Sequence, residues 1–142
     1  MKLPDLNVLL YATNKDSPQH RRARDWLEAA LEEPAGVGFA WAALLGFVRL
    51  ATRQGILTAP LAVEDALGVM TAWLSHPAAH VVNPTEHHAP LLARLLIGAG
   101  RGGNLTTDAH LAALAIEHGA TLASFDRDFA RFTGLDFELL EA

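Results

Sequence analysis

An α/β fold with a mainly parallel sheet covered by helices is predicted by three features of this sequence. Short β-forming runs alternate with longer stretches in which apolar residues recur at helical spacing. No hairpin signal such as Asn-Gly joins two of the short runs, so a helix is expected between successive strands. The 142 residues, of which 51% are hydrophobic and 19% charged, are enough for a compact core, and we expect one domain over residues 1–142.

The first half of the chain is predicted to contain two strands and four helices. Apolar residues at helical spacing, including Trp26 and Leu27, indicate a helix with Pro18 in its first turn, where the missing N–H costs nothing. Gly55 and Pro77 follow the last two helices as breaks in the pattern. The expected elements are a strand Lys2–Pro4, helices Leu6–Ala12 and Pro18–Glu33, a strand Val37–Ala40, and helices Trp41–Arg53 and Val63–Ser75.

The second half is predicted to alternate in the same way. A glycine-rich loop from Gly100 to Asn104 separates two helices, and Gly119 ends the second of them as a C′ residue. The three tryptophans lie at core-like positions: Trp26, Trp41 and Trp73. The expected elements are a strand Val81–Val82, helices Glu86–Ala99 and Thr107–His118, a strand Thr121–Phe125, a short helix Arg127–Phe132 and a strand Phe137–Leu140.

Composition narrows the classes of function. The chain has no cysteine, which excludes disulfides, thiol catalysis and thiolate metal sites. No apolar run approaches the roughly 18 residues of a membrane-spanning helix, and no signal peptide is visible, so we expect a cytoplasmic protein without membrane association. The net charge of −5 argues against a non-specific nucleic-acid binder. However, nine of the eleven basic residues are arginine, whose planar fork suits phosphate.

Four aspartates are expected at one edge of the sheet. Asp5 directly follows the first strand, and Asp126 and Asp128 follow the strand Thr121–Phe125. Asp108 opens a helix after the glycine-rich loop. In parallel α/β folds, chemistry lies outside the carboxyl ends of the strands. Carboxylates crowded there repel one another unless a cation neutralises them, and Mg²⁺ or Mn²⁺ prefers such oxygen ligands. The sequence therefore predicts an acidic metal site.

Each of these aspartates also has a structural interpretation. Asp108 could be the N-cap of its helix, and Asp126 could cap the short helix that begins at Arg127. Asp128, in the first turn of that short helix, would complement the helix dipole. Asp5 interrupts an otherwise apolar stretch, and a buried carboxylate there needs a partner. Their coincidence at one sheet edge favours a site.

Three stretches of the chain resemble the PIN-domain nucleases, and specifically the VapC-like toxins of toxin–antitoxin pairs. They are Leu3-Pro-Asp5-Leu-Asn7-Val-Leu-Leu, Gly103-Asn-Leu-Thr-Thr-Asp108-Ala-His-Leu-Ala-Ala-Leu-Ala and Gly119-Ala-Thr-Leu-Ala-Ser124-Phe-Asp126-Arg-Asp128-Phe. The resemblance implies a three-layer α/β/α sandwich that uses Mg²⁺ or Mn²⁺ to hydrolyse RNA phosphodiesters. It also implies a cognate antitoxin that silences the site, and a homodimer.

The same resemblance assigns roles to individual residues. Asp128 is a further catalytic candidate, which could hold the attacking water. Asn7 and Ser124 match polar positions that support the site through hydrogen bonds. The carboxylates implied to bind metal are Asp5, Asp108 and Asp126.

One departure from the family pattern bears on the expected activity. These nucleases usually carry a glutamate on the helix after the second strand, whereas this chain has Gly46 there and no acidic residue between Glu33 and Glu64. Arg49, one helical turn beyond Gly46, could hold substrate phosphate or partly fill the space of the missing side chain. The alternative function is therefore a PIN-like module that binds RNA or a protein without cutting.

Other kinds of site are less well supported. No pair at i, i+4 spacing occurs among His87, His88, His110 and His118, so a histidine metal site is not expected. A haloacid-type phosphatase would need an aspartate where Asn7 stands, and a receiver domain would need a lysine after a late strand. No Gly-x-x-x-x-Gly-Lys loop for nucleotide phosphates is present.

Overall fold

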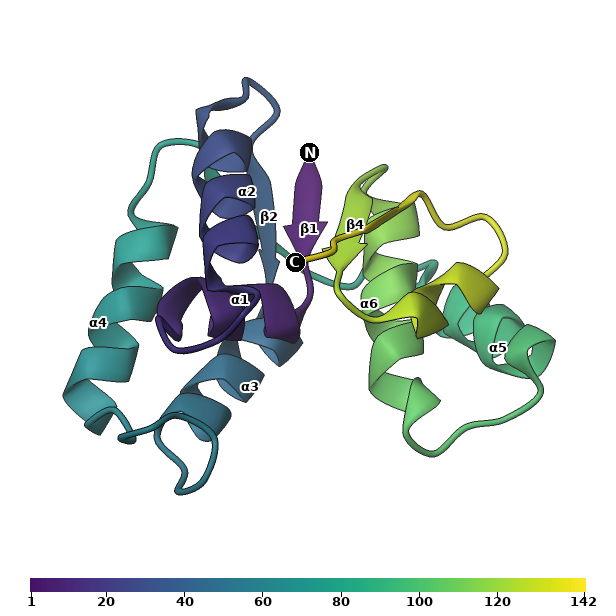
Figure 1. Ribbon diagram of the computed structural model, residues 1–142. Coiled ribbons are helices and arrows are strands. Elements are labelled where there is room, and N and C mark those ends of the chain that lie inside the picture. Colours follow the sequence, from purple (N-terminus) through teal and green to yellow (C-terminus); the bar gives the residue numbers. More distant parts are fainter.

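The computed structural model describes all 142 residues and contains one five-stranded sheet (Figure 1). The strands are β1 (Lys2–Pro4), β2 (Val37–Ala40), β3 (Ala79–Val82), β4 (Thr121–Ser124) and β5 (Phe137–Leu139). Their spatial order is β3-β2-β1-β4-β5, and every neighbouring pair is parallel. The predicted α/β fold with a parallel sheet is confirmed, and β1 lies at the centre of the sheet.

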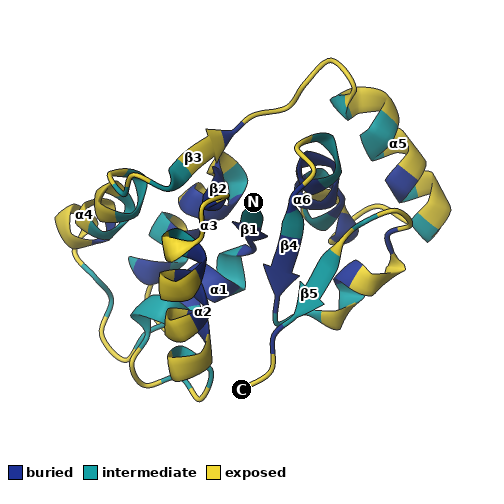
Figure 2. Ribbon diagram, turned by 90° about the horizontal axis from the view of Figure 1, so that it is seen from above, coloured by how far each residue is buried: buried dark blue, intermediate teal, exposed yellow.

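Helices cover both faces of the sheet and produce three layers. The first four helices surround one buried cluster, which includes Trp26, Phe39 and Phe47. The last two helices and a 3₁₀ helix surround a second cluster, which includes Leu114 and Phe129. Figure 2 shows that buried residues line the central strands and the sides of the helices that face them, whereas the edge strands β3 and β5 are mostly intermediate or exposed. The helices are α1 (Leu6–Thr13), α2 (His20–Glu32), α3 (Trp41–Ala51), α4 (Val63–Leu74), α5 (His88–Ala99), α6 (Leu105–Glu117) and the 3₁₀ helix η1 (Arg127–Arg131).

Helix α6 is buried along most of its length, and this fixes the position of Asp108. Its buried side chains are mainly alanine and leucine, and the small alanines let the helix pack closely against the sheet. The helix leads into β4 and runs antiparallel to it, so its first turn lies at the edge where the parallel strands end. A membrane span would need a longer and more apolar helix than any found here.

Three helices start at residues other than the predicted ones, and α5 begins at His88 instead of Glu86. Helix α2 begins at His20, because Pro18 lies in a preceding turn closed by the His20 N–H donating to Ser17 O at 3.1 Å. Helix α6 begins at Leu105, since the Leu105 N–H already donates to the Gly102 carbonyl. Asp108 therefore lies within the first turn, and its interpretation as an N-cap is wrong.

The tryptophans divide into two that pack in the core and one that does not. Trp26 is 4% exposed and Trp73 packs against Phe39 and Phe47, as predicted. Trp41 is 42% exposed, so its predicted core position is wrong. Trp41 is the first residue of α3 and directly follows β2, at the edge of the sheet where the strands end.

Candidate active site

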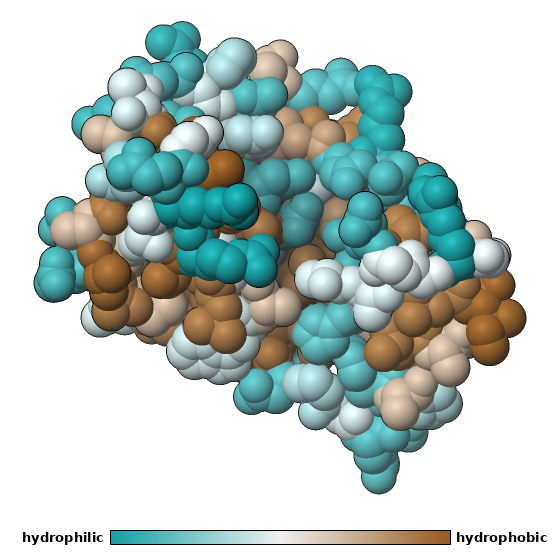
Figure 3. All heavy atoms as spheres, turned by 90° about the horizontal axis from the view of Figure 1, so that it is seen from below, coloured by the Kyte–Doolittle hydropathy of each residue, from teal (hydrophilic) through white to brown (hydrophobic).

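Aspartates from three segments of the chain meet at the carboxyl edge of the sheet. A pocket of about 440 Å³ is lined by Asp108, Asp126 and Asp128, together with residues of the 101–105 loop. Asp5 follows β1, which pairs with β4, and lies beside this pocket with only 7% of its surface exposed. Viewed from the side toward which the strands point, hydrophilic side chains gather across the middle of the molecule between apolar areas (Figure 3). The four predicted carboxylates are thus brought to one place.

Hydrogen bonds fix the position of Asp5. Its Oδ1 accepts a hydrogen bond from the Leu6 N–H at 2.7 Å, which also caps α1. Its Oδ2 accepts from the Ser124 hydroxyl at 2.7 Å. The oxygen of Ser124, itself fully buried, accepts in turn from Asn7 Nδ2 and from the Asp126 N–H, each at 3.0 Å. Ser124 thus hydrogen-bonds to Asp5, Asn7 and Asp126, and Asn7 and Ser124 are the two residues to which the resemblance gives a supporting role.

Asp126 and Asp128 open the 3₁₀ helix η1. Asp126 Oδ1 accepts from the Asp128 N–H at 2.9 Å, so the interpretation of Asp126 as a helix cap is confirmed. The second carboxylate oxygen of Asp126 accepts no hydrogen bond from the protein and can serve a ligand. Asp128 Oδ1 accepts a hydrogen bond from Arg131 Nη2 at 3.0 Å, which links two residues three positions apart in η1.

The acidic pocket is lined by three aspartates and one arginine, Arg101, so negative charge predominates in it. Burial is the largest cause that raises the pKa of Asp108, which reaches about 6. The negative charges of Asp5, Asp126 and Asp128 raise this pKa further, and the positive charge of Arg131 only partly opposes them. Burial also raises the pKa of Asp5, despite its hydrogen bonds from Ser124 and Leu6. Such a pocket favours a bound cation.

The donor atoms fit a hard divalent ion. They are carboxylate oxygens, which Mg²⁺ and Mn²⁺ prefer. No three acidic or histidine side chains are already arranged as a closed set of metal ligands. Mg²⁺ does not require one, because it usually keeps several waters and binds through one or two carboxylates. Asp108 and Asp126, which line the pocket, are the residues best placed to hold it, with Asp5 beneath them.

Gly46 and Arg49 do not complete this pocket. Gly46 is buried, and a Cβ there would lie 2.9 Å from Leu6 Cδ2, so a larger side chain must displace Leu6. Leu6, the residue after Asp5, thus occupies the space next to position 46 that the side chain of the usual glutamate would need. Arg49 is exposed and is not among the residues that line the acidic pocket.

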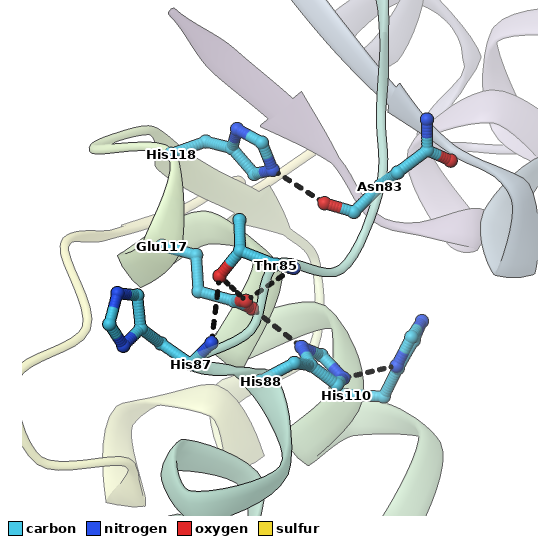
Figure 4. A network of polar contacts seen from close by, with 7 residues as sticks. All are labelled: Asn83, Thr85, His87, His88, His110, Glu117 and His118. Carbon is cyan, nitrogen blue, oxygen red and sulfur yellow. Dashed lines mark hydrogen bonds and ion pairs between the residues drawn. The ribbon is translucent and has the colours of Figure 1, made fainter.

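A second polar cluster lies near the other end of α6 (Figure 4). Glu117 accepts hydrogen bonds from the Thr85 N–H at 2.9 Å and the Thr85 hydroxyl at 2.6 Å, and it pairs with His88 Nδ1. His88 Nε2 meets His110 Nδ1 at 2.9 Å. Sequence reasoning separated these histidines, whereas the packing of α5 on α6 joins them. The signal that it missed is the spacing of His110 and Glu117, two turns apart on one face of α6.

Comparison with known proteins adds independent information on the family. The chain matches the PIN domain family over residues 2–135. It is 51% identical to Ribonuclease VapC37 of Mycobacterium tuberculosis over 138 residues, which cover 97% of this chain and 96% of that protein. It is 41% identical to Ribonuclease VapC33 of the same species over 135 residues, which cover 95% of this chain and 94% of that protein.

Solved structures share the fold at low sequence identity. The structure of VapBC2 from Rickettsia felis, bound to a DNA fragment from its promoter, matches with a TM-score of 0.73 and 17% identity over 99% of this chain and 98% of that chain. VapC20 of Mycobacterium tuberculosis, described as a toxin that cleaves the sarcin-ricin loop, matches with a TM-score of 0.68 and 19% identity over 92% and 93% of the two chains. With the family match and the two relatives above, these likenesses lead to one assignment: the chain belongs to the PIN domain family, among relatives named VapC ribonucleases.

Proposed function

We propose that this protein is a metal-dependent endoribonuclease that hydrolyses RNA phosphodiester bonds as the toxin of a toxin–antitoxin pair. The observation that carries the proposal is the pocket at the carboxyl edge of the sheet, which three aspartates line with Asp5 beside them, and in which half-buried Asp108 has a raised pKa. Ribonuclease relatives that match almost the whole chain support it. The cytoplasm, where RNA and a newly made antitoxin are both present, is the proposed place of action.

The residues of the pocket have distinct roles in this proposal. When bound, Mg²⁺ or Mn²⁺ would lower the pKa of a water molecule and offset negative charge on the phosphate. Asp108 and Asp126, which line the pocket, would hold the ion, and the buried Asp5 beside them would add its negative charge. Ser124 and Asn7 keep the Asp5 carboxylate oriented toward this centre. Asp128 orients the attacking water by accepting a hydrogen bond from it.

A groove on the opposite face of the sheet supports the antitoxin as a partner. It is about 460 Å³ in volume and lies where α1, α2 and α4 meet, with Leu27, Leu31 and Trp73 among its apolar residues, and with basic Lys15 and Arg24 and one acid, Glu28. An amphipathic helix with acidic residues on its flanks fits such a groove. Structures of relatives in complexes named VapBC, such as the one from Rickettsia felis, agree with this partner.

We place the proposed homodimer contact on α3. Trp41 and Leu45 lie one helical turn apart there, and they are 42% and 61% exposed. Large apolar side chains that are exposed together are typical of a protein–protein interface. Light scattering should give twice the mass of the chain, and Leu45→Lys should give a monomer; a monomer without the substitution would contradict the contact.

The non-catalytic alternative is less favoured, because three carboxylates line the pocket and Asp5 lies beside it although Gly46 replaces the usual glutamate. The experiment that separates the two is cleavage of a labelled RNA in Mn²⁺ buffer, with Asp5→Asn and Asp108→Asn prepared in parallel. The exposed acid Asp65 provides the control variant Asp65→Asn. We expect cleavage by the wild type and the control, and loss of cleavage in the two pocket variants and in EDTA. Undiminished cleavage by Asp108→Asn would remove this mechanism, and calorimetry without any Mn²⁺ binding would favour the module.

A further inference from the structure

A basic cavity adjoins the acidic pocket. It has a volume of about 250 Å³ and is lined by Arg94 of α5, Arg131 at the end of η1 and Thr133 in the following turn, with Leu95 and Gly98. The two arginines come from segments far apart in the sequence and line the same cavity. A cavity with two arginines and a hydroxyl is suited to an anion that accepts several hydrogen bonds, such as a phosphate.

The Asp128–Arg131 ion pair forms the wall between the two cavities. Asp128 lines the acidic pocket, and its Oδ1 is 3.0 Å from Arg131 Nη2. This bond occupies only one of the five N–H donors of the guanidinium, so Arg131 retains others for the basic cavity. If one phosphate of an RNA strand lies in the acidic pocket, a neighbouring phosphate would therefore lie close to the basic cavity.

The other side of the cavity is kept open by two features of α5. Arg94 is exposed and takes part in none of the ion pairs of the structure, so its charge is available. Gly98 follows one turn later, and a Cβ there would have no atom within 4 Å. A glycine inside a helix costs about 1 kcal/mol relative to alanine, and no packing contact explains this one. Its effect is to leave space below Arg94.

We propose that this cavity binds a backbone phosphate of the RNA strand, one that neighbours the scissile phosphate, through Arg94 and Arg131. The inference rests on the proposed function, because it assumes that the scissile phosphate lies in the acidic pocket. An RNA strand carries one negative charge per nucleotide, and the aspartates repel each phosphate that the metal does not neutralise. A basic cavity directly beside the acids supplies the compensating charge and fixes the register of the strand.

The test measures RNA binding rather than cleavage. The Asp108→Asn chain in Mg²⁺ buffer, with a labelled single-stranded RNA, provides a form in which cleavage does not interfere with fluorescence anisotropy. We expect Arg94→Met in this background to weaken binding about fivefold at 0.1 M salt and to reduce the slope of log K against log salt by about 0.7, the value for one phosphate contact on a single strand. Arg21→Met is the matched control, because Arg21 is an exposed, unpaired arginine of α2 on the opposite face of the sheet.

Two further measurements separate a phosphate site from a general loss of positive charge or a folding defect. Gly98→Leu fills the cavity without changing any charge, and we expect it to weaken binding as Arg94→Met does. In a series of RNAs, each carries a neutral methylphosphonate at a single linkage, and the position of that linkage moves along the strand from one RNA to the next. We expect one position in the series at which Arg94→Met weakens binding no further. Equal effects of Arg94→Met and Arg21→Met, unchanged binding by Gly98→Leu, or sensitivity to Arg94→Met at every methylphosphonate position would each overturn the site. Failure of the wild type to cleave RNA would instead count against the proposed function.

Discussion

Helix α6 holds an acidic side chain near each of its ends, Asp108 in the first turn and Glu117 at the last residue. The helix dipole alone favours a negative charge at the first position and disfavours one at the second. The pKa values are shifted in the opposite sense, since that of Asp108 is raised to about 6 and that of Glu117 is lowered. Local partners therefore outweigh the dipole at both ends.

The partners explain the difference between the two acids. Burial works against the charged form of Glu117, whose side chain is 2% exposed, but hydrogen bonds from Thr85 and His88 outweigh it. Asp108 accepts no such bonds and lies among other carboxylates. An acid whose hydrogen bonds are complete stabilises the fold, whereas an acid left among like charges marks a place where a ligand supplies the missing partner. In the proposed function, the same helix thus has a structural end at Glu117 and a functional end at Asp108.

The largest effect is expected at the functional end. Asp108→Asn should reduce RNA cleavage by at least about 100-fold, because a metal-bound centre supplies several kcal/mol of transition-state stabilisation. In EDTA at pH 7.5 the same variant should have a Tm about 3 °C above the wild type, because one of the mutually repelling charges is gone. Paired activity and thermal unfolding measurements check this, with Asp65→Asn as the control. A lower Tm would mean that Asp108 is structural after all.

The structural end should show the reverse behaviour. Glu117→Ala leaves the Thr85 N–H, the Thr85 hydroxyl and His88 without their acceptor, and we expect a loss of about 2–3 kcal/mol in the free energy of unfolding. RNA cleavage per folded molecule should stay unchanged. Urea unfolding followed by circular dichroism measures the loss. Glu86→Ala, at a side chain that is 87% exposed, is the control, and equal stability of the two variants would contradict the comparison.

A smaller effect is expected in the pH dependence of stability without divalent ions. The pKa of Asp108 in the folded protein, about 6, is above the value of 3.8 expected for the unfolded chain, so the folded state holds its proton more tightly. The resulting stability is present at pH 3.8 and below and is lost as the pH rises through 6. Solvent screens this half-buried group, and we expect a difference of about 1 kcal/mol.

The comparison of wild type with Asp108→Asn isolates this contribution. Burial and the neighbouring His88 lower the pKa of His110, which gives a contribution of opposite sign, lost as the pH falls below 6.5. Both proteins share that contribution, so it cancels in their difference. Thermal unfolding in EDTA checks this. As the pH rises from 4.5 to 7.5, the Tm of the wild type should fall relative to that of the Asp108→Asn variant. Parallel curves would show that the Asp108 carboxylate is not destabilised by its surroundings.

The functional end could be predicted from the sequence, and the structural end could not. Asp5 and Asp126 are found by a local rule, because a residue that directly follows a parallel strand lies at the carboxyl edge of the sheet. Asp108 was included because it opens a helix directly after the glycine-rich loop. In contrast, His88 and Glu117 are 29 residues apart on separate helices, and their contact depends on how α5 packs on α6. No spacing rule within one helix could reveal that pair.

The errors in the predicted elements have a similar origin. Helical periodicity identified α6 but not its first residue, since the start is set by the Gly102 carbonyl that accepts from the Leu105 N–H. That shift moves Asp108 from a capping position into the first turn, where it can face the pocket. Trp41 was assigned to the core by its residue type, whereas its exposure depends on where β2 ends relative to the helices. In each case, tertiary contacts decide what the local pattern leaves open.

The smallest effect concerns Gly46, where a carboxylate could be restored to the functional end. Gly46→Glu and Gly46→Gln both push against Leu6, so their packing costs are similar and their difference reports the added charge. Without divalent ions at pH 7.5, we expect the Glu variant to be less stable than the Gln variant by up to about 1 kcal/mol, because position 46 lies against the residue that follows Asp5. Added Mg²⁺ should narrow this gap in thermal unfolding, since a cation attracts the extra carboxylate. Equal stability of the two variants, or a difference that Mg²⁺ leaves unchanged, would show that a carboxylate at position 46 does not interact with the acidic pocket. The uncompensated charge would then come from the four aspartates alone.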